Sequence, residues 1–556
     1  MLSLEAPEGT RYPGGQRALS VPRPARFDIR DYGPNVVPGV DCTTAIQGTI
    51  AAAVAVQGEV YIPPGRWLAS PQAARTTATT TINAQGHALV VPAAGGVTIC
   101  GESRSLSAID FRAFGGGSPE TSYQVVSADG AVWRGGGLFL DGGTSSGSAA
   151  APIVIRDLEL FGGALNTGNA AFPANPSTGD GWDLTHKGVW LRNAGFFKDV
   201  LIERCHIHGF KGELIYGGAN SLTQLGNVTG RSNDLHDTNG DCWSVVGAAV
   251  TFEDNDCYQA AGNGVEDNYF HANCSYRRNR IRDIGLHGMW IYPGYGTGPY
   301  GVVDIEDNRV ERTGLEGIRA DNPQNVSVRD NKVIDAGTSS TYSGIHVGAV
   351  GGTNGPTKVR GAVVERNVVL AHSRAMFIGV QVYDEGGAPD TRLVVRDNIV
   401  GLTTDAVAAG YTVTQGFDLA AITDPKAIVH DNTSRGSIYL SSDTGNVREF
   451  LLSTTALTDV VKRRPQMLGN YQVLIYYRVV TAPTLLTVTV SWYDAAGAQS
   501  LDIVSAISAA VGSHAVQPLV INVVGDSEAK YVKVSAQAAT ANQVYLSAQL
   551  IEMPNL

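Results

Sequence analysis

Nine polar and aromatic residues between positions 241 and 346 carry the side chains best suited to chemistry. They recur at matching places after a repeated motif, so we expect them to face one surface. Carboxylates, imidazoles, a guanidinium and flat aromatic rings together suit acid–base catalysis on a sugar polymer. The nine residues are Asp241, Glu266, His287, Trp290, Tyr292, Glu316, Arg319, Asp321 and His346.

Three of these residues are carboxylic acids that we predict to act as catalytic acid and base: Asp241, Glu266 and Glu316. On stacked coils about 4.8 Å apart, carboxylates of neighbouring coils would be about 5 Å apart, and those two coils apart about 10 Å apart. These separations bracket the geometries of retaining and inverting glycosidases. Crowding of like charges also raises the pKa of one carboxyl group, which suits it to donate a proton.

The other six residues are predicted to bind the substrate. Trp290 and Tyr292 offer flat apolar faces to pyranose rings, and Arg319 can hold hydroxyl or acidic groups. An outward polar side chain in a repeat protein is ordinarily only solvated, and the aromatic neighbours are what single out this row. The remaining binding candidates are His287, Asp321 and His346.

A short motif recurs along the chain: an apolar residue, two polar residues, Asn, any residue, and an apolar residue. Alternation of apolar and polar residues on both sides of the Asn is the period of a β-strand. Asn tolerates left-handed backbone angles, so we expect it to form a tight bend and its side chain to join a ladder of stacked amides. The Asn positions are 233, 255, 279, 308, 331, 367, 398 and 432.

The uneven spacing of these bends predicts the architecture. Repeats separated by 22 to 36 residues indicate coils with loops of different length, whereas a propeller needs a more constant period. The pattern predicts a parallel β-helix, a solenoid in which each coil contacts its neighbours. Counting on from the bends, Val265, Met289, Ile318 and Ile345 should point inward, and the residue after each should point outward.

Composition excludes several classes of protein. The chain has 556 residues with a formal net charge of −11, so a general nucleic-acid binder is not expected. Hydrophobic residues make up 43%, which excludes a disordered chain. The longest apolar stretches are too short to span a membrane, and the first residues lack the features of a secretory signal.

Neither a metal site nor a disulfide framework is predicted. The six cysteines form no CxxC pair and are expected to be small buried residues. His206 and His208 alternate on one predicted strand, but no carboxylate stands at a matching place, so no metal ligation is predicted. We expect no cofactor.

The N-terminal part adds an independent signal. Residues 27–70 read as strand, loop, helix and strand, with DYGP at 31–34, DCTTAI at 41–46 and VYIPPG at 60–65. This segment resembles the N-terminal module of the pectate-lyase-like superfamily, which is common in phage tailspikes and polysaccharide-degrading enzymes. VTICGESRSLSAID at 97–110 resembles its next coil, and the resemblance extends over roughly residues 27–440.

The resemblance and the strand patterns together predict an all-β fold: a right-handed parallel β-helix with a short N-terminal capping helix and a C-terminal β-sandwich. From residue 446 the alternation is cleaner and continuous, which is typical of a sandwich that serves trimerisation or carbohydrate binding. The expected organisation is an N-terminal arm at 1–26, a capping module with the first coils at 27–110, the β-helix at 111–445 and the sandwich at 446–556.

The resemblance implies a phage tailspike-like depolymerase that binds and hydrolyses a bacterial capsular or exopolysaccharide. It implies a homotrimer in the virion tail, docked to another tail protein through the N-terminal arm, or alternatively an extracellular enzyme. A polysaccharide lyase is the first alternative, with His287, Arg319 and Tyr292 as base and charge-neutralising groups. A receptor spike that binds glycan without cleaving it is the second.

Overall fold

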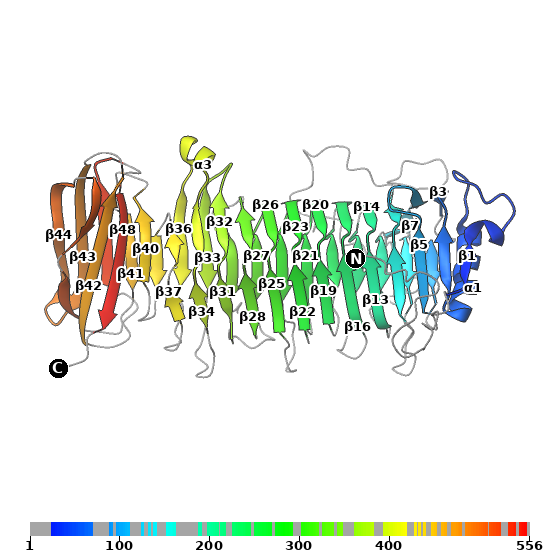
Figure 1. Ribbon diagram of the computed structural model, residues 1–556, viewed down its shortest axis with the longest axis horizontal. Coiled ribbons are helices and arrows are strands. Elements are labelled where there is room, and N and C mark those ends of the chain that lie inside the picture. Colours follow the sequence, from blue (N-terminus) through cyan, green and yellow to red (C-terminus); the bar gives the residue numbers. More distant parts are fainter. Residues whose placement is uncertain are drawn as a thin grey trace, which may run out of the picture.

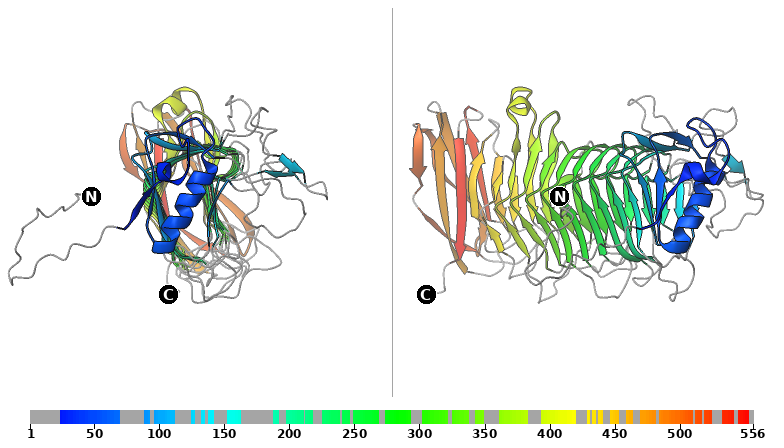
Figure 2. Two further views of the ribbon diagram at one scale, coloured as in Figure 1. Left: turned by 90° about the vertical axis from the view of Figure 1, so that its right-hand side faces the viewer. Right: turned by 45° about the vertical axis from the view of Figure 1, so that its right-hand side comes forward.

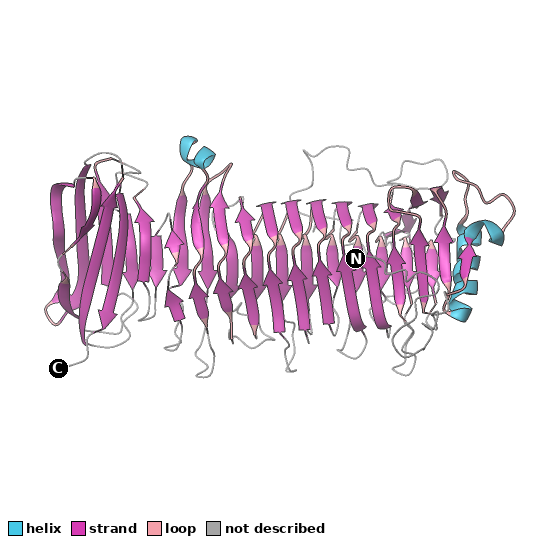
Figure 3. Ribbon diagram, viewed as in Figure 1, coloured by secondary structure: helices cyan, strands magenta, loops and turns pink. Residues whose placement is uncertain are grey.

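The computed structural model shows an elongated molecule made almost entirely of strands (Figures 1 and 3). Three long sheets run along its length, and successive strands of each sheet come from successive coils of the chain. The structure describes residues 24–69, 88–92, 96–111, 124–126, 132–134, 137–141, 152–162, 187–191, 197–210, 212–217, 225–238, 240–245, 249–268, 273–292, 302–321, 325–337, 342–348, 361–382, 393–419, 428–430, 432–434, 437–440, 446–452, 458–463, 469–480, 484–509, 511–516, 518–523, 532–540 and 544–552.

Two of the long sheets are parallel throughout. Sheet A contains β1 (Arg26–Asp28), β2 (Glu59–Ile62), β5 (Val97–Gly101), β10 (Ile153–Arg156), β13 (Phe197–Glu203), β16 (Leu225–Arg231), β19 (Ala249–Glu253), β22 (Asn273–Arg277), β25 (Val302–Glu306), β28 (Val326–Arg329), β31 (Val363–Glu365), β34 (Val394–Arg396) and β37 (Ile428–His430). Sheet B contains β3 (Gly65–Leu68), β6 (Ser107–Asp110), β11 (Glu159–Phe161), β14 (His206–Phe210), β17 (Asp234–Thr238), β20 (Asp256–Ala260), β23 (Arg280–Ile284), β26 (Arg309–Thr313), β29 (Lys332–Ile334), β32 (Val368–Ala371), β35 (Ile399–Leu402) and β38 (Thr433–Ser434).

The third sheet, sheet C, carries the predicted functional residues. Its parallel strands are β4 (Leu89–Val91), β9 (Leu138–Leu140), β12 (Val189–Leu191), β15 (Ile215–Gly217), β18 (Trp243–Val245), β21 (Val265–Asn268), β24 (Met289–Tyr292), β27 (Ile318–Asp321), β30 (Ser343–Gly348), β33 (Met376–Val382), β36 (Val413–Leu419), β39 (Ser437–Leu440) and β41 (Thr458–Arg463). The predicted parallel β-helix is therefore present. A separate hairpin joins β7 (Gln124–Val126) to β8 (Val132–Arg134).

The Asn ladder joins sheet A to sheet B at every coil from residue 233 onward. Asn308 illustrates it: its backbone N–H and its Nδ2 both donate to Oδ1 of Asn331, each at 3.0 Å. The same Nδ2 also donates to the carbonyl oxygen of Tyr276 at 2.9 Å. Every ladder member from Asn233 to Asn432 is at most 3% exposed. The ladder satisfies backbone groups that the bend removes from the sheets.

The bend differs from the sequence-based expectation in one respect. The left-handed residue is the one before the Asn, as in Asp254 with φ 58° and Asp307 with φ 55°. The Asn itself is not among the residues with positive φ in the described coils. Its side chain must turn inward to meet the next coil, and the preceding polar residue turns outward in the left-handed conformation. The prediction that Asn forms the left-handed position was therefore wrong.

Apolar side chains fill the interior between the three sheets. Trp243, Val265, Met289, Ile318 and Ile345 occupy one inward column of sheet C, paired in register, and none is exposed. The inward placement counted from the bends is thus confirmed. All six cysteines are buried, as expected.

A single long helix covers the N-terminal end of the solenoid (Figure 2). Helix α1 (Thr43–Val56) buries Ile46 and Ile50 against the first coil, and it follows the short 3-10 helix η1 (Ile29–Tyr32). Asp41 Oδ1 accepts hydrogen bonds from the backbone N–H (2.9 Å) and hydroxyl (2.5 Å) of Thr43, which caps the first turn. The predicted capping helix is present, and it closes an end that would otherwise expose the core.

Antiparallel strands close the other end of the molecule (Figure 1). Sheet C continues from β41 into β47 (Val532–Ala538), β43 (Thr484–Asp494) and β44 (Gly497–Ala509). A second sheet is built from β40 (Asn446–Leu451), β48 (Val544–Glu552), β42 (Gly469–Val479), β45 (Gly512–Ala515) and β46 (Leu519–Val523). These strands fit the predicted C-terminal sandwich. A second helix, α3 (Thr404–Ala408), follows β35.

An alternating ladder of charge runs along the outer face of sheet A. Residues in register on successive coils are, in order, Arg156, Glu203, Arg231, Glu253, Arg277, Glu306, Arg329, Glu365 and Arg396. Arg231 Nε donates to Glu203 Oε2 at 2.6 Å, and Arg396 Nε donates to Glu365 Oε2 at 2.7 Å. We call this row the charge ladder.

No helix in the described part of the chain is both long enough and apolar enough to cross a membrane. The expected N-terminal arm, residues 1–26, lies almost wholly outside the described residues.

Candidate active site

The predicted site residues gather on the outer face of sheet C and on the turn that precedes each of its strands. Glu266, Trp290, Arg319 and His346 pair in register on four adjacent strands, β21 to β30. The residue three positions before each of the first three lies in the preceding turn: Asn263, His287 and Glu316. Asp241 holds the same turn position one coil earlier, where its carbonyl oxygen accepts from the Leu214 N–H. We call these two columns the polar row.

Asp241 and Glu266 form a carboxyl pair across neighbouring coils. Asp241 is 4% exposed and Glu266 is 3% exposed. Burial, followed by the charge of Glu266 and a hydrogen bond to it, raises the pKa of Asp241 well above its usual range. Asp241 therefore holds its proton to a higher pH than an ordinary aspartic acid does.

Asn263 orients both members of the carboxyl pair. Its backbone N–H donates to Asp241 Oδ1 at 2.5 Å, and its Nδ2 donates to Glu266 Oε2 at 3.4 Å. Its Oδ1 accepts from the backbone N–H of His287 at 3.1 Å and lies 2.9 Å from His287 Nδ1. Asn263 therefore links the carboxyl pair to the imidazole of the next coil.

His287 and Glu316 make a second group of polar side chains further along the polar row. His287 Nε2 lies 3.1 Å from Glu316 Oε2, and Arg319 Nη1 lies 3.6 Å from Glu316 Oε1. Burial favours the neutral form of Glu316, but contact with His287 and the charges of His287 and Arg319 outweigh it and lower the pKa of Glu316. Glu316 is thus a stable carboxylate and a poor proton donor.

Trp290 and Arg319 are anchored by a single carboxylate. Trp290 Nε1 donates to Asp321 Oδ2 at 2.8 Å, and Arg319 Nε donates to both oxygens of Asp321 at 2.9 and 2.8 Å. Arg319 Cζ lies 5.7 Å from the centroid of the Trp290 ring, within cation–π range. Asp321 is 1% exposed, whereas the Arg319 side chain keeps 20% of its surface exposed.

The far end of the polar row is neutral. His346 Nδ1 lies 2.9 Å from Gln381 Oε1. The Nε2 of Gln381 donates to Asp418 Oδ2 at 3.1 Å. Burial lowers the pKa of His346, although nearby Asp321 acts in the opposite direction. Tyr292 ends β24, and its side chain lies outside the described part of the structure.

Two charged residues that sequence reasoning did not assign to the site extend the turn column toward the N-terminus. Lys187 is 1% exposed and forms a buried ion pair with Glu213 of the next coil. Lys187 Nζ also lies 4.0 Å from the centroid of the Tyr216 ring. Glu213 contributes to the raised pKa of Asp241, so this ion pair belongs to the same electrostatic system.

A signal for these residues exists in the sequence. In every coil of this region the outward residue of the strand follows the turn residue by three positions: Lys187 to Trp190, Glu213 to Tyr216, Asp241 to Ser244, Asn263 to Glu266, His287 to Trp290, and Glu316 to Arg319. The spacing continues before the first Asn of the ladder, so counting from the strands rather than from the Asn residues finds Lys187 and Glu213.

Most of the site residues are more buried than side chains on the outer face of an uncovered sheet would be. The carboxyl pair, His287, Glu316, Asp321 and His346 are all at most 8% exposed. Among the predicted residues with described side chains, Trp290 and Arg319 are the more accessible ones. In the polar row, the Trp290 ring and the Arg319 guanidinium are thus partly exposed to solvent, whereas the carboxyl groups and imidazoles are buried.

Comparison with known proteins agrees with this architecture. Residues 226–448 match the family model described as right handed beta helix region. That match and the three stacked sheets identify this part of the chain as a right-handed parallel β-helix. No curated protein matches the chain.

Several solved structures are similar in fold. The A-module of the mannuronan C-5 epimerase AlgE4 from Azotobacter vinelandii is 16% identical, with 73% of this chain and 100% of that chain covered and a TM-score of 0.48. The enzymatically active domain of tailspike protein 2 from bacteriophage CBA120 is 10% identical, with 96% and 76% covered and a TM-score of 0.43. The catalytic unit of a GH87 α-1,3-glucanase from Streptomyces thermodiastaticus is 14% identical, with 77% and 64% covered and a TM-score of 0.36.

Proposed function

We propose that the protein is a polysaccharide-cleaving enzyme that hydrolyses glycosidic bonds with Asp241 as acid and Glu266 as its partner carboxylate. The observation that carries the proposal is the buried carboxyl pair, in which burial and the charge of Glu266 raise the pKa of Asp241. Glycosidases need this division of labour between two carboxyl groups. The N-terminal motifs at 31–34, 41–46 and 60–65 support the substrate class.

The placement of the pair on adjacent coils favours retention of configuration. Retaining enzymes hold their two carboxyl groups about 5 Å apart, whereas inverting enzymes leave room for a water between more distant groups. Asp241 and Glu266 are hydrogen-bonded to each other, which is nearer to the retaining arrangement. When the hydrogen bond between the two side chains opens, Asp241 can protonate the glycosidic oxygen. Glu266 then attacks the anomeric carbon, and water later releases the sugar with Asp241 as base.

Substrate binding is assigned to the accessible part of the polar row. Trp290 offers a ring face for a pyranose, and its indole is fixed by Asp321. Arg319, held by the same carboxylate, is placed to meet a hydroxyl or acidic group of the polymer. Glu316 is unsuitable as the acid because its pKa is lowered. In this proposal it instead positions His287 and Arg319, which it contacts.

The decisive experiment combines the purified protein with a panel of bacterial capsular and exopolysaccharides and analyses soluble products by mass spectrometry. Hydrolysis gives oligosaccharides at the hydrated repeat mass. Glu266→Gln and Asp241→Asn should each lower the rate by at least about 100-fold, while Glu306→Gln in the charge ladder should not change it. Full activity in both site variants would contradict the assignment.

One observation favours a lyase as the second candidate. The Arg319 side chain is 20% exposed, compared with 6% for Glu316 and 1% for Asp321, and a guanidinium can neutralise a uronate carboxylate for β-elimination. Lyase products carry an unsaturated bond, absorb in the ultraviolet and are lighter by one water. Binding of a polymer without any shortening would instead support a glycan-binding spike.

The biological setting that we propose is a homotrimeric phage tail protein that binds a bacterial surface polysaccharide, with an extracellular enzyme as the alternative. Support comes from the N-terminal resemblance and from antiparallel strands that follow the β-helix. Size-exclusion chromatography with light scattering tests the assembly. A mass three times that of the 58.5 kDa chain is expected, and a monomer at micromolar concentration would contradict it.

A further inference from the structure

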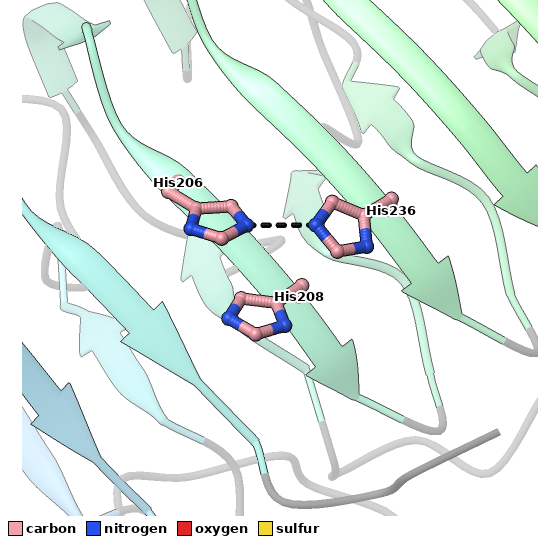
Figure 4. A group of neighbouring side chains, drawn as sticks. All are labelled: His206, His208 and His236. Atoms are coloured by element: carbon pink, nitrogen blue, oxygen red, sulfur yellow. Dashed lines mark hydrogen bonds between the residues drawn. The ribbon is translucent and has the colours of Figure 1, made fainter. Parts of the chain in front are cut away.

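Three histidines form a compact cluster on sheet B, away from the polar row of sheet C (Figure 4). His206 and His208 belong to β14, and His236 belongs to β17 on the next coil. The paired strands place His208 directly opposite His236. One ring nitrogen from each residue lies within 4.8 Å of the others. Strand alternation within β14 predicts that His206 and His208 share a face, but it does not place His236 beside them.

From this geometry we infer that His206, His208 and His236 bind one divalent transition-metal ion, with Zn²⁺ as the chemically favoured class. Three neutral imidazoles are a common ligand set for zinc, with remaining positions left to water. The proposal is independent of the carboxyl pair and of the function proposed for it.

The facing nitrogens are already aimed at one another. His206 Nε2 lies 2.7 Å from His236 Nε2, as the dashed line in Figure 4 shows. Ligand nitrogens around zinc at about 2.0–2.1 Å from the metal need a somewhat wider separation, so binding requires the two rings to part slightly. The His206 and His208 rings are stacked at 4.1 Å with planes 6° apart. They must therefore also tilt to converge on one ion.

A carboxylate prepares one of the ligands. His236 Nδ1 lies 2.9 Å from Asp237 Oδ2, which selects the tautomer with the proton on Nδ1 and leaves the Nε2 lone pair available. A carboxylate behind a metal-binding imidazole is the usual arrangement for fixing ring orientation and raising ligand basicity. On binding, His206 need only change tautomer so that its Nε2 also offers a lone pair.

A second carboxylate stands beside the third ligand. His208 Nε2 lies 3.1 Å from Glu159 Oε1, and Arg66 Nη2 donates to the same oxygen at 2.8 Å. Glu159 can orient the His208 ring from the preceding coil or balance the charge of the ion. Local strand spacing does not predict this carboxylate, because Glu159 lies 47 residues before His206 in the chain.

The cluster is reachable from solvent. The side chains of His208 and His236 keep 16% and 12% of their surface exposed. A metal ion can therefore enter from solvent.

The test is titration of metal-free, untagged full-length protein with Zn²⁺ by isothermal calorimetry, and with Co²⁺ by visible absorption. One ion per chain is expected, with a raised melting temperature and Co²⁺ bands of nitrogen ligation. His206→Ala and His236→Ala should each weaken Zn²⁺ binding by at least about 100-fold, and Asp237→Asn by about 10-fold. The control is His372→Ala, which removes a histidine hydrogen-bonded to Thr403.

Asp237 has a φ of 54°, which Asn tolerates, so Asp237→Asn keeps the fold even if a histidine variant does not. Circular dichroism of every metal-free variant separates loss of ligand from loss of fold. The proposal is overturned if the wild-type protein binds no stoichiometric Zn²⁺, or if folded His206→Ala and His236→Ala proteins bind it as tightly as wild type. It is equally overturned if His372→Ala abolishes binding and the cluster variants do not.

Discussion

Asp241 is hydrogen-bonded to Glu266, which stands on the next coil, and both side chains are almost completely buried. The two residues are 25 positions apart in sequence, so only the stacking of coils brings them together. A buried carboxyl group that keeps its proton costs stability at neutral pH, because the unfolded chain would release that proton. The relationship therefore links the proposed chemistry to a measurable pH dependence.

The first prediction concerns Asp241→Asn. The pKa of Asp241 is raised on folding, so its contribution to stability is present below the unfolded pKa of about 3.9 and is lost as pH rises toward the folded pKa. An amide cannot ionise, so the free energy of unfolding of the variant, relative to wild type, should increase by up to about 1.4 kcal/mol per pH unit in this interval. Urea unfolding from pH 4 to pH 8 measures the difference, and parallel curves would refute it.

The second prediction concerns the Asn ladder. Asn308→Ala removes an acceptor for the backbone N–H and Nδ2 of Asn279 and a donor to Tyr276. Each buried group left without a partner costs about 1–3 kcal/mol, so the free energy of unfolding should fall by at least about 2 kcal/mol. Chemical denaturation measures it. Lys332→Ala, on the exposed side of the same region, should change stability by less than about 0.5 kcal/mol.

The third prediction concerns the buried ion pair. Lys187→Met leaves Glu213 buried without its cation, which should cost about 3–5 kcal/mol. The double variant Lys187→Met with Glu213→Leu removes both charges and should recover most of that loss. Thermal unfolding of these two variants and of the Glu213→Leu single variant gives the interaction energy between Lys187 and Glu213. If the double variant is as unstable as the sum of the singles, the pair contributes by packing and not by charge.

The fourth prediction separates binding from chemistry in the polar row. Asp321→Asn weakens the anchor shared by Trp290 and Arg319. Asp321 lies on β27, two coils beyond Glu266 on β21. We expect KM for the cleaved polysaccharide to rise by about 5- to 20-fold, with kcat within about threefold of wild type. Steady-state kinetics decides this. A fall in kcat with unchanged KM would instead place Asp321 in the chemical step.

Much of the solenoid could be predicted because its cause is local and repeated. The bend before Asn255, Asn279 and Asn308 recurs with the same apolar neighbours, so the inward residue of each following strand can be counted. The same counting predicts that Glu266, Trp290 and Arg319 share a face, because parallel strands in register keep side chains aligned. Residue types and register were sufficient for this part of the site.

Other features depend on contacts that one coil does not specify. The hydrogen-bonding partner of His206 is His236, and the pairing follows from the length of the intervening coil. Lys187 precedes the first Asn of the ladder, so a count from the bends does not reach it. The burial of Asp241 and His287 depends on neighbouring segments rather than on strand alternation. Strand periodicity predicts direction, whereas burial and pKa follow from the surrounding structure.

The charge ladder of sheet A constrains how this solenoid can change in length. Arginine and glutamate alternate at the same position on consecutive coils from Arg156 to Arg396. Removal of one coil would set Arg against Arg or Glu against Glu across a single step, whereas removal of two adjacent coils would preserve every opposite-sign contact. A gain or loss of two adjacent coils therefore keeps the alternation of charge, whereas a gain or loss of a single coil breaks it.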